Sequence, residues 1–209
     1  LFFKMTNKNF IIHEVVAGKD GKPVAKKLCQ KAHNLKYVQY PPTSPQKNSN
    51  KTNASGDRNP KAIVVQNDCL WFSRTVKCDG RSAVQWHQVN LDGTTVQSGM
   101  LQNEKRSYIQ STLAVNDRQD VLVGFQETGT DMFISPRMAY RKASDPAGEL
   151  RPIISLGEGK AAMAGGAWGD YSGSTIDGAN GIDLWTVQSI ADDTGRGDTV
   201  IAKMPLQDK

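Results

Sequence analysis

One plan recurs three times along this chain, at a spacing of roughly 50 to 60 residues. Each copy has a short strand, a polar turn and then a strand with apolar residues on both faces. Asn, Asp and Gly tolerate left-handed backbone, so these turns suit hairpins. The repetition predicts an all-β chain of successive similar sheets. The turns lie at 67–68, 116–117 and 177–178, and the apolar strands follow at 70–72, 121–123 and 182–185.

Those apolar strands bear on the choice between two all-β architectures. In a β-sandwich, one face of each sheet commonly meets water, so apolar and polar residues alternate. In a β-propeller, neighbouring blades cover both faces of the inner strands. The pattern predicts a β-propeller of four-stranded antiparallel blades, and a β-sandwich with irregular loops is the alternative.

The repeats also suggest boundaries. Residues 1–15 match only the later part of a repeat, so we expect this chain to supply about three to four blades of a larger propeller. Residues 39–57 are rich in Pro, Asn and Ser without apolar periodicity, which predicts an exposed loop. The expected parts are 1–38 for the end of one blade, 39–57 for that loop, 58–103 and 104–160 for two blades, and 161–209 for the final blade.

Charge and hydropathy exclude two classes of partner. The net charge is +5, and the lysine excess lies early, between residues 4 and 36. Basic and aromatic residues do not alternate as they do in a nucleic-acid platform, so we expect no nucleic-acid partner. No run approaches the roughly 20 apolar residues that cross a bilayer, so we expect no membrane span.

The cysteine and histidine patterns argue against a disulfide scaffold and a zinc site. Cys69 and Cys78 fall at the two ends of one predicted strand, about 30 Å apart. A disulfide requires Cα atoms within about 7 Å, so these two should not pair, whereas the pairing of Cys29 stays open. The histidines are scattered without the spacing of zinc ligands.

The C-terminal part resembles a known family. The run Trp-Gly-Asp-Tyr-Ser-Gly at 168–173, the turn at 177–178 and the strand at 184–186 are similar to the closing blades of sialidase-like β-propellers of the BNR or Asp-box type. In the extracellular branch of that family, such a loop precedes the final blade. The resemblance covers residues 58–204 and implies a secreted, cell-surface or periplasmic protein.

The chain also departs from the family pattern. An Asp-box reads Ser-x-Asp-x-Gly-x-Thr-Trp, whereas the stretch 174–185 is longer and lacks the Thr. The branch carries Arg immediately before Trp168, where this chain has Ala167. Such propellers include both glycosidases and binding scaffolds, so the resemblance leaves the activity open.

The resemblance implies a set of catalytic candidates. A sialidase-like hydrolase binds a substrate carboxylate with arginines and uses a Tyr nucleophile paired with Glu, together with an acidic Asp. The non-catalytic alternatives are that Asp170 caps its loop or pairs with an Arg, and that Tyr171 packs or hydrogen-bonds beside Trp168. The candidates are Tyr171, Glu127, Asp170, Arg58 and Arg137.

A calcium site is the one cofactor that the residues suggest. Asp177, Asn180 and Asp183 stand three residues apart and offer oxygen ligands of the kind that Ca²⁺ binds. They lack the dense pattern of an EF-hand loop, and Asp183 falls within a predicted strand. A turn followed by a solvent-facing residue is the alternative.

The loops of a propeller are exposed around a central channel, where they are free to vary. We therefore expect an extracellular or periplasmic β-propeller module, non-catalytic, that binds protein or glycan partners. The alternative is a sialidase-like glycoside hydrolase with part of its active site outside this chain. The expected structural partner is the N-terminal part of the same propeller or another subunit. Trp71 and Trp185 are expected in the core.

Overall fold

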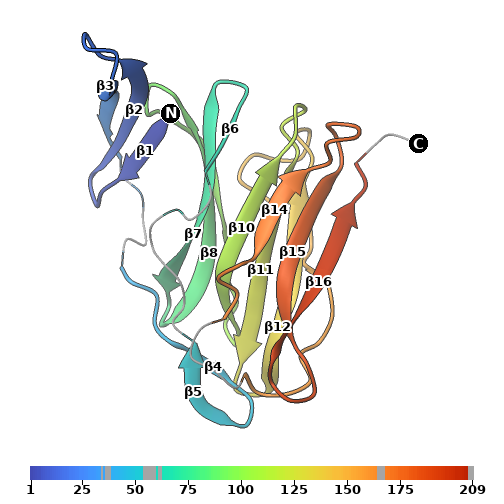
Figure 1. The fold of residues 1–209 in the computed structure, drawn as a ribbon. Helices are drawn as coiled ribbons and strands as arrows, with labels where there is room; N and C mark the ends of the chain where they lie inside the picture. Colours follow the sequence, from blue (N-terminus) through green and yellow to red (C-terminus); the bar gives the residue numbers. More distant parts are fainter. Residues whose placement is uncertain (34, 36–38, 54–59, 61–62, 164–167, 207–209) are drawn as a thin grey trace.

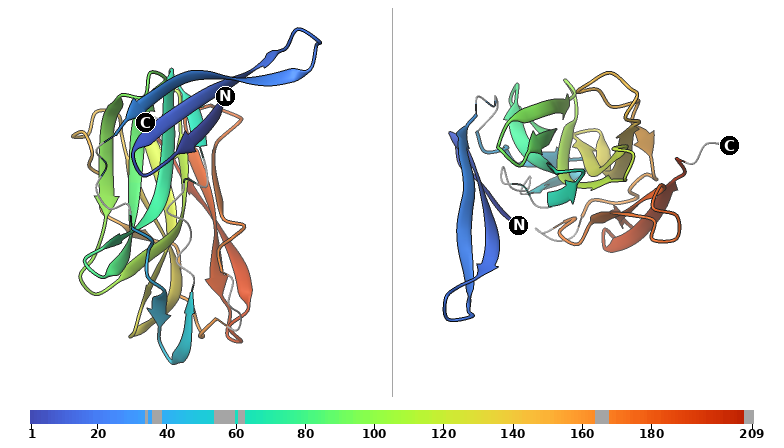
Figure 2. Two further views of the ribbon diagram at one scale, coloured as in Figure 1. Left: turned by 90° about the vertical axis from the view of Figure 1, so that its left-hand side faces the viewer. Right: turned by 90° about the horizontal axis from the view of Figure 1, so that it is seen from above.

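The computed structural model describes residues 1–33, 35, 39–53, 60, 63–163 and 168–206 (Figure 1). Every pair of neighbouring strands in it is antiparallel. Three sheets follow one another along the chain and lie side by side, and each is built from strands that are consecutive in sequence (Figures 1 and 2). The predicted all-β fold of antiparallel, propeller-like blades is therefore confirmed.

The strands of these three sheets are as follows. The first contains β6 (Ile63–Gln66), β7 (Cys69–Cys78), β8 (Arg81–Asn90) and β9 (Thr95–Leu101). The second contains β10 (Ser107–Val115), β11 (Val121–Gly129), β12 (Met132–Arg141) and β13 (Ile154–Ser155). The third contains β14 (Gly173–Ile176), β15 (Leu184–Ala191) and β16 (Gly197–Met204).

The predicted turns join the first two strands of each sheet. Asn67 and Asp68 both adopt positive φ, at 49° and 56°, which bulky residues rarely do. Asn116 accepts from the backbone N–H groups of Arg118 and Asp120 through its side-chain oxygen. In the third sheet the strand begins at Leu184, two residues later than predicted. The backbone N–H groups of residues 182 and 183 instead donate to the side chain of Asn180, which keeps them in the loop.

Apolar side chains fill the spaces between the sheets. Trp71 and Trp86 stack with ring centroids 6.4 Å apart and pack against Leu113, Val123 and Phe125 of the second sheet. A separate cluster joins the second and third sheets through Ala114, Leu122, Met138, Leu184 and Met204. Sheet faces that cover one another in this way bury apolar area, which is the main stabilising term of such a fold.

The expectation that all three apolar strands are covered on both faces holds for β7 and β11 and is wrong for β15. Along β15, buried and partly exposed residues alternate. Leu184 is buried against the second sheet, whereas Trp185 points to the other face and is partly exposed. Among the residues that the structure describes, no sheet covers that outer face, and Ile201 on β16 is 65% exposed there.

The N-terminal residues form a sheet of their own from β1 (Phe2–Met5), β2 (Asn9–Ala17) and β3 (Pro23–Ala32). The Phe3 and Phe10 rings lie 5.1 and 6.1 Å from that of Phe72, which fastens this sheet to the outer face of the first blade-like sheet. Beyond that contact the β2–β3 hairpin projects away from the other sheets (Figure 2). β3 is exposed along nearly its whole length.

The segment 39–57, predicted as an exposed loop, contains a short hairpin of β4 (Ser44–Gln46) and β5 (Ser49–Asn53). Ser44 and Gln46 are buried, because β4 lies against one end of the second sheet. The side-chain oxygen of Gln46 accepts from the backbone N–H of Met163 at 2.9 Å. The part of this segment at 54–57 lies outside the described residues.

Cys69 and Cys78 begin and end β7 as predicted, and all the cysteines are free thiols. No helix in the described part of the chain has the length and apolar character that a membrane crossing requires.

Candidate functional site

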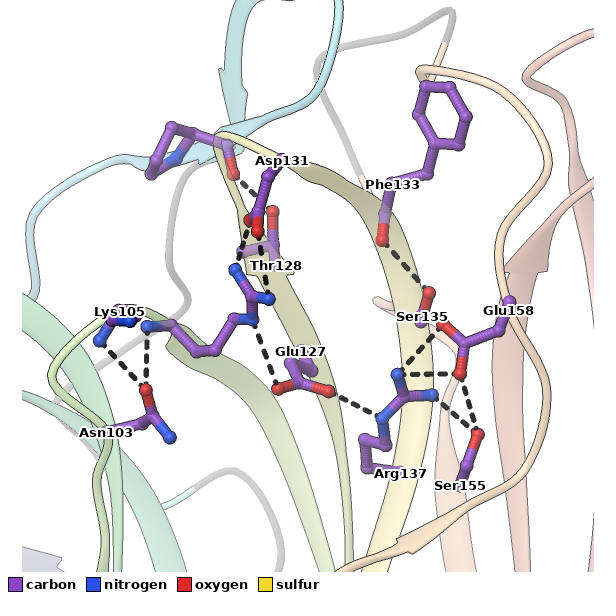
Figure 3. Close-up of polar contacts among 12 residues, drawn as sticks. Asn103, Lys105, Glu127, Thr128, Asp131, Phe133, Ser135, Arg137, Ser155 and Glu158 are labelled. Carbon is purple, nitrogen blue, oxygen red and sulfur yellow. Dashed lines mark hydrogen bonds and ion pairs between the residues drawn. The ribbon is translucent and has the colours of Figure 1, made fainter.

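Five side chains of alternating charge form a line across one end of the second sheet (Figure 3). We call this line the charged chain. Glu127 on β11 is its centre: one carboxylate oxygen lies 2.6 Å from Arg137 Nε, and the other lies 3.7 Å from Arg106 Nε. The chain reads Asp131, Arg106, Glu127, Arg137 and Glu158 in order.

Arg137 is held on every side by the protein. Besides Glu127, its guanidinium donates to Glu158 at 3.0 Å, to Ser155 Oγ at 2.9 Å and to the Gly157 carbonyl at 2.8 Å. Its side chain is only 8% exposed. A group already saturated in this way fastens the 155–158 segment to β12 and is not presented to a substrate carboxylate.

Tyr108 is a neighbour of Glu127 that the sequence did not single out. In the antiparallel register it stands directly opposite Glu127, and it is 3% exposed. Burial, and then the charge of Glu127, raise the pKa of this phenol. The arrangement places a Tyr beside a Glu, but a phenol with a raised pKa is a poor nucleophile.

A different feature opens beside β10: a cleft of about 450 Å³ between that strand and the Trp-Gly-Asp-Tyr-Ser-Gly loop. Two features of the chain shape it. Gln110 has a φ of 53° at a bulge in β10, and Gly169 has a φ of 72° in the loop. The lining residues are Gln110, Ser111, Thr112, Gly169, Asp170, Ser172, Gly173 and Ser174.

The cleft residues Thr112 and Ser174 belong to a polar network between the second and third sheets. Their hydroxyl oxygens lie 2.6 Å apart. The network continues through Thr186, Gln188 and Gln126, each 0–1% exposed, and reaches the indole N–H of Trp168. Buried polar groups whose bonds are satisfied by one another are held in fixed orientations, so they form a rigid floor for the cleft.

Of the two loop candidates, Asp170 lines this cleft and Tyr171 is not among its lining residues. Asp170 accepts a hydrogen bond from Gln110 Nε2 at 3.4 Å. Tyr171 is 96% exposed, so the expectation that it packs beside Trp168 is wrong. Trp168 instead lies in a cluster with Ile109 and Ile134, because the left-handed Gly169 that follows it turns the loop back outward.

The structure brings only some of the catalytic candidates together. Glu127 and Arg137 contact each other, and Asp170 and Tyr171 are adjacent in the loop. Glu127 shares its sheet face with Phe125, which packs toward the first blade-like sheet. Residue 126 points to the opposite face, where a Cβ at Gly169 would lie 3.7 Å from its side chain. The two pairs therefore lie on opposite faces of the second sheet. Arg58 is outside the described residues.

The calcium candidates are arranged around an ammonium group. Lys203 Nζ lies 2.9 Å from one carboxylate oxygen of Asp177 and 2.9 Å from one of Asp183. The side-chain amide of Asn180 donates to Asp183, and the backbone N–H of Leu206 donates to the other oxygen of Asp183. The backbone N–H of Leu206 and the Lys203 ammonium hold the pKa of Asp183 far below its usual value. Within the described residues, no group of three His, Cys, Asp or Glu side chains could hold a metal ion.

Comparisons with known proteins add little to this geometry. No protein-family model and no curated protein matches the sequence. One similar solved structure is the crystal structure of α-L-arabinofuranosidase from Lactobacillus brevis, with a TM-score of 0.44 and 8% sequence identity. The match covers 99% of this chain and 72% of that chain. A likeness this distant supports no functional argument, so the assignment of the sheets rests on their own topology.

The cleft thus brings together polar groups from β10 and from the loop that carries the exposed Tyr171. The side chains of the charged chain already pair with one another, and the cluster around Lys203 fastens a loop to a strand. The sequence analysis singled out the loop that forms one wall of the cleft, but the contribution of β10 carries no local motif. A polar Gln-Ser-Thr run inside an otherwise apolar strand is the signal that could have found it.

Proposed function

We propose that this chain is a non-catalytic binding module of the β-propeller type, and that it binds a glycan in the cleft beside β10. The observation that carries the proposal is the composition of that cleft. It presents hydroxyl, amide and carboxylate groups from two elements, and Tyr171, which is 96% exposed, lies in sequence between the lining residues Asp170 and Ser172. Sugars are polar on their edges and apolar on their ring faces, so they match hydrogen-bonding groups beside an exposed aromatic side chain.

The choice of binding over hydrolysis depends on the number of carboxylates. Most glycoside hydrolases use two carboxyl groups separated by about 5 to 9.5 Å. The described cleft lining contains one, Asp170. Glu127 lies on the opposite sheet face in an ion pair with Arg137. A sialidase-like activity with further residues supplied from outside this chain is the competing hypothesis.

We also propose that the chain is related to the sialidase-like β-propellers that its 168–173 loop resembles, and that it is located outside the cytoplasm. The proposal also includes a structural partner: a further sheet of the same propeller, on this or another polypeptide, that covers the outer face of β14–β16. Trp71 is fully buried by the neighbouring sheet, whereas Trp185 on that outer face remains partly exposed. An additional sheet would bury Trp185 in the same way.

The test is a glycan panel read by binding and by turnover. We expect the wild-type chain to bind a subset of the panel and Tyr171→Ala to weaken that binding by about tenfold, through loss of ring contact. Tyr40→Ala is the matched control, because Tyr40 is also exposed, at 62%, but lies beside the first blade-like sheet and not beside β10. The residue before it, Gln39, accepts a hydrogen bond from the backbone N–H of Lys77 on β7 through its carbonyl. A panel without any binder would contradict the proposal. If the wild-type chain hydrolyses a fluorogenic sialoside and Asp170→Asn abolishes that hydrolysis, the hydrolase hypothesis would be established instead.

A further inference from the structure

A row of aromatic rings crosses the contact between the N-terminal sheet and the first blade-like sheet, and a histidine stands at each end of it. The ring centroids of His33, just after β3, and of Phe10 on β2 lie 4.5 Å apart. Phe10 lies 6.1 Å from Phe72 on β7, and Phe72 lies 4.7 Å from His87 on β8. The row therefore runs from one sheet into the other.

His87 differs from the other members of this row. It is 0% exposed, and neither of its ring nitrogens has a hydrogen-bond partner in the described structure. Buried polar groups are nearly always hydrogen-bonded, so such an exception calls for an explanation. Burial, and then the charges of Arg74 and His33, hold the pKa of His87 well below its ordinary value of 6.5. The ring is therefore neutral at pH 7.

The groups that face His87 from the elements packed against it carry no negative charge in the described part of the chain. The charged or titratable ones are Arg74 on β7 and His33 after β3. Ser98 stands opposite His87 on β9. The remaining neighbours belong to the apolar cluster at the contact between the sheets and include Phe3, Met5, Phe10 and Phe72. A proton on His87 would thus create a buried cation without a counter-charge or an acceptor.

The N-terminal sheet is attached to this face by few contacts. In the described structure these are the apolar cluster around Phe72 and a polar contact of Lys31 with Asp92 and Thr94 in the β8–β9 turn. Lys31 and Asp92 are exposed, and ion pairs of exposed side chains contribute about 0–1 kcal/mol. The β2–β3 hairpin projects beyond the cluster (Figure 2). The attachment therefore depends mainly on the cluster that His87 adjoins.

We propose that His87 acts as an acid-sensitive switch for the N-terminal sheet: its protonation releases this sheet from the first blade-like sheet, while the other sheets stay packed. Release brings water to the imidazolium, which the docked arrangement excludes. The switch does not depend on ligand binding in the cleft.

The sign of the pH dependence follows from the lowered pKa of His87. A base whose pKa is lowered by docking stabilises the docked state above its ordinary pKa of 6.5, and that contribution is lost as the pH falls below this value. One proton is taken up on release. The equilibrium constant for docking should therefore fall by about tenfold for each pH unit below 6.5, until the docked form is itself protonated.

The experiment follows the methionine methyl signals of the full chain by NMR from pH 7.5 down to pH 5. Met5 belongs to the cluster at this contact, whereas Met138 and Met204 belong to the cluster between the second and third sheets. We expect the Met5 signal to move or split as the pH falls, with the Met138 and Met204 signals unchanged. A Met5 signal that stays constant down to pH 5 would overturn the proposal. Simultaneous loss of all three signals would overturn it too, because that reports unfolding of the whole chain.

Variants of His87 test its role. His87→Phe retains a ring against Phe72 but cannot be protonated, so its Met5 signal should keep the docked position over the whole range. His87→Gln removes the titrating group with a polar side chain, and the methyl signals at pH 7.5 show whether each variant is folded. His13→Gln is the matched control, since it removes a histidine of β2 that is outside the row and should leave the Met5 response intact. A folded His87 variant whose Met5 signal still responds to pH would contradict the proposal.

The ring proton of His87 gives a direct readout. Its Cε1–H signal is assigned by its absence from the spectrum of His87→Phe. We expect this signal to titrate together with the Met5 methyl signal, because the ring gains its proton when the sheet is released. Titration of His87 without any change at Met5 would show that the ring is protonated in the docked state, and the switch would be ruled out.

Discussion

Gly124 shows how a single residue can determine the packing between two sheets. It lies on β11 directly under the polar network, and a Cβ at this position would collide with Gln188 Nε2 and Thr186 Oγ1. Its φ is not in the left-handed region, so backbone freedom is not the reason for the glycine. The requirement is space: the side chains of the third sheet occupy the volume that a methyl group would take.

Gly124→Ala should therefore lower the free energy of unfolding by about 1–3 kcal/mol, as overpacking of a rigid site does. Denaturant unfolding of the purified chain measures it. Gly178→Ala is the control, since a Cβ there meets nothing within 4 Å. Equal midpoints for the two variants would show that the network yields to an added methyl group.

At the scale of elements, the loop between β14 and β15 is fastened to β16 by charge. Lys203 bridges Asp177 and Asp183, and its ammonium also lies 5.4 Å from the centre of the Trp185 ring. The hydrogen bond from Lys203 to Asp177, and then that to Asp183, raise the pKa of the lysine. The pKa values of both carboxyl groups are lowered in turn.

The sign of the pH dependence follows from these shifts. Acids with a lowered pKa stabilise the fold above their ordinary pKa of 3.8, and that contribution is lost as the pH falls below it. The contribution of Lys203 is present below its ordinary pKa of 10.5 and is lost as the pH rises beyond it. The cluster therefore stabilises the fold between those limits.

Lys203→Met should destabilise the chain at pH 7, because Asp177 and Asp183 then repel each other without a cation between them. The difference from wild type should shrink as the pH falls from 7 toward 3, since protonation relieves that repulsion. Unfolding midpoints across this range measure it, with Lys22→Met as the control at a side chain 82% exposed. A difference in unfolding midpoint between Lys203→Met and wild type that stays constant with pH would contradict this role of Lys203.

At the scale of the whole molecule, the sheets are covered unequally. The first blade-like sheet lies between the N-terminal sheet and the second sheet, and the second lies between its neighbours on both sides. The third presents Trp185 and Ile201 outward. Stability should be distributed in the same way, with the largest contributions from side chains between covered faces.

Trp71→Ala should cost about 3–5 kcal/mol of unfolding free energy, as the removal of a buried aromatic does. Trp185→Ala should cost less than half as much in the isolated chain, because its ring is partly exposed there. Denaturant midpoints of the two variants give the comparison. Equal losses would show that the outer face of β15 is covered in solution, and light scattering would then identify whether a second copy covers it.

The sequence alone was sufficient for the strand repeats, the hairpin turns and the loop at 168–173. These are local properties, since residue-by-residue alternation and turn chemistry depend on neighbours in the chain. The same local reasoning missed the start of β15, because the side chain of Asn180 captures two backbone N–H groups that a strand would have used.

Only the tertiary structure decided which candidate residues meet. Glu127 and Asp170 are both acidic residues that the sequence offers as catalytic candidates. In the structure they lie on opposite sides of the second sheet, because side chains alternate between its two faces. The cleft arises where the loop returns to β10, and residues 112 and 174 contact each other across 62 positions of sequence. Contacts of that range depend on how sheets stack, which no local pattern encodes, and they determine which side chains line the cleft.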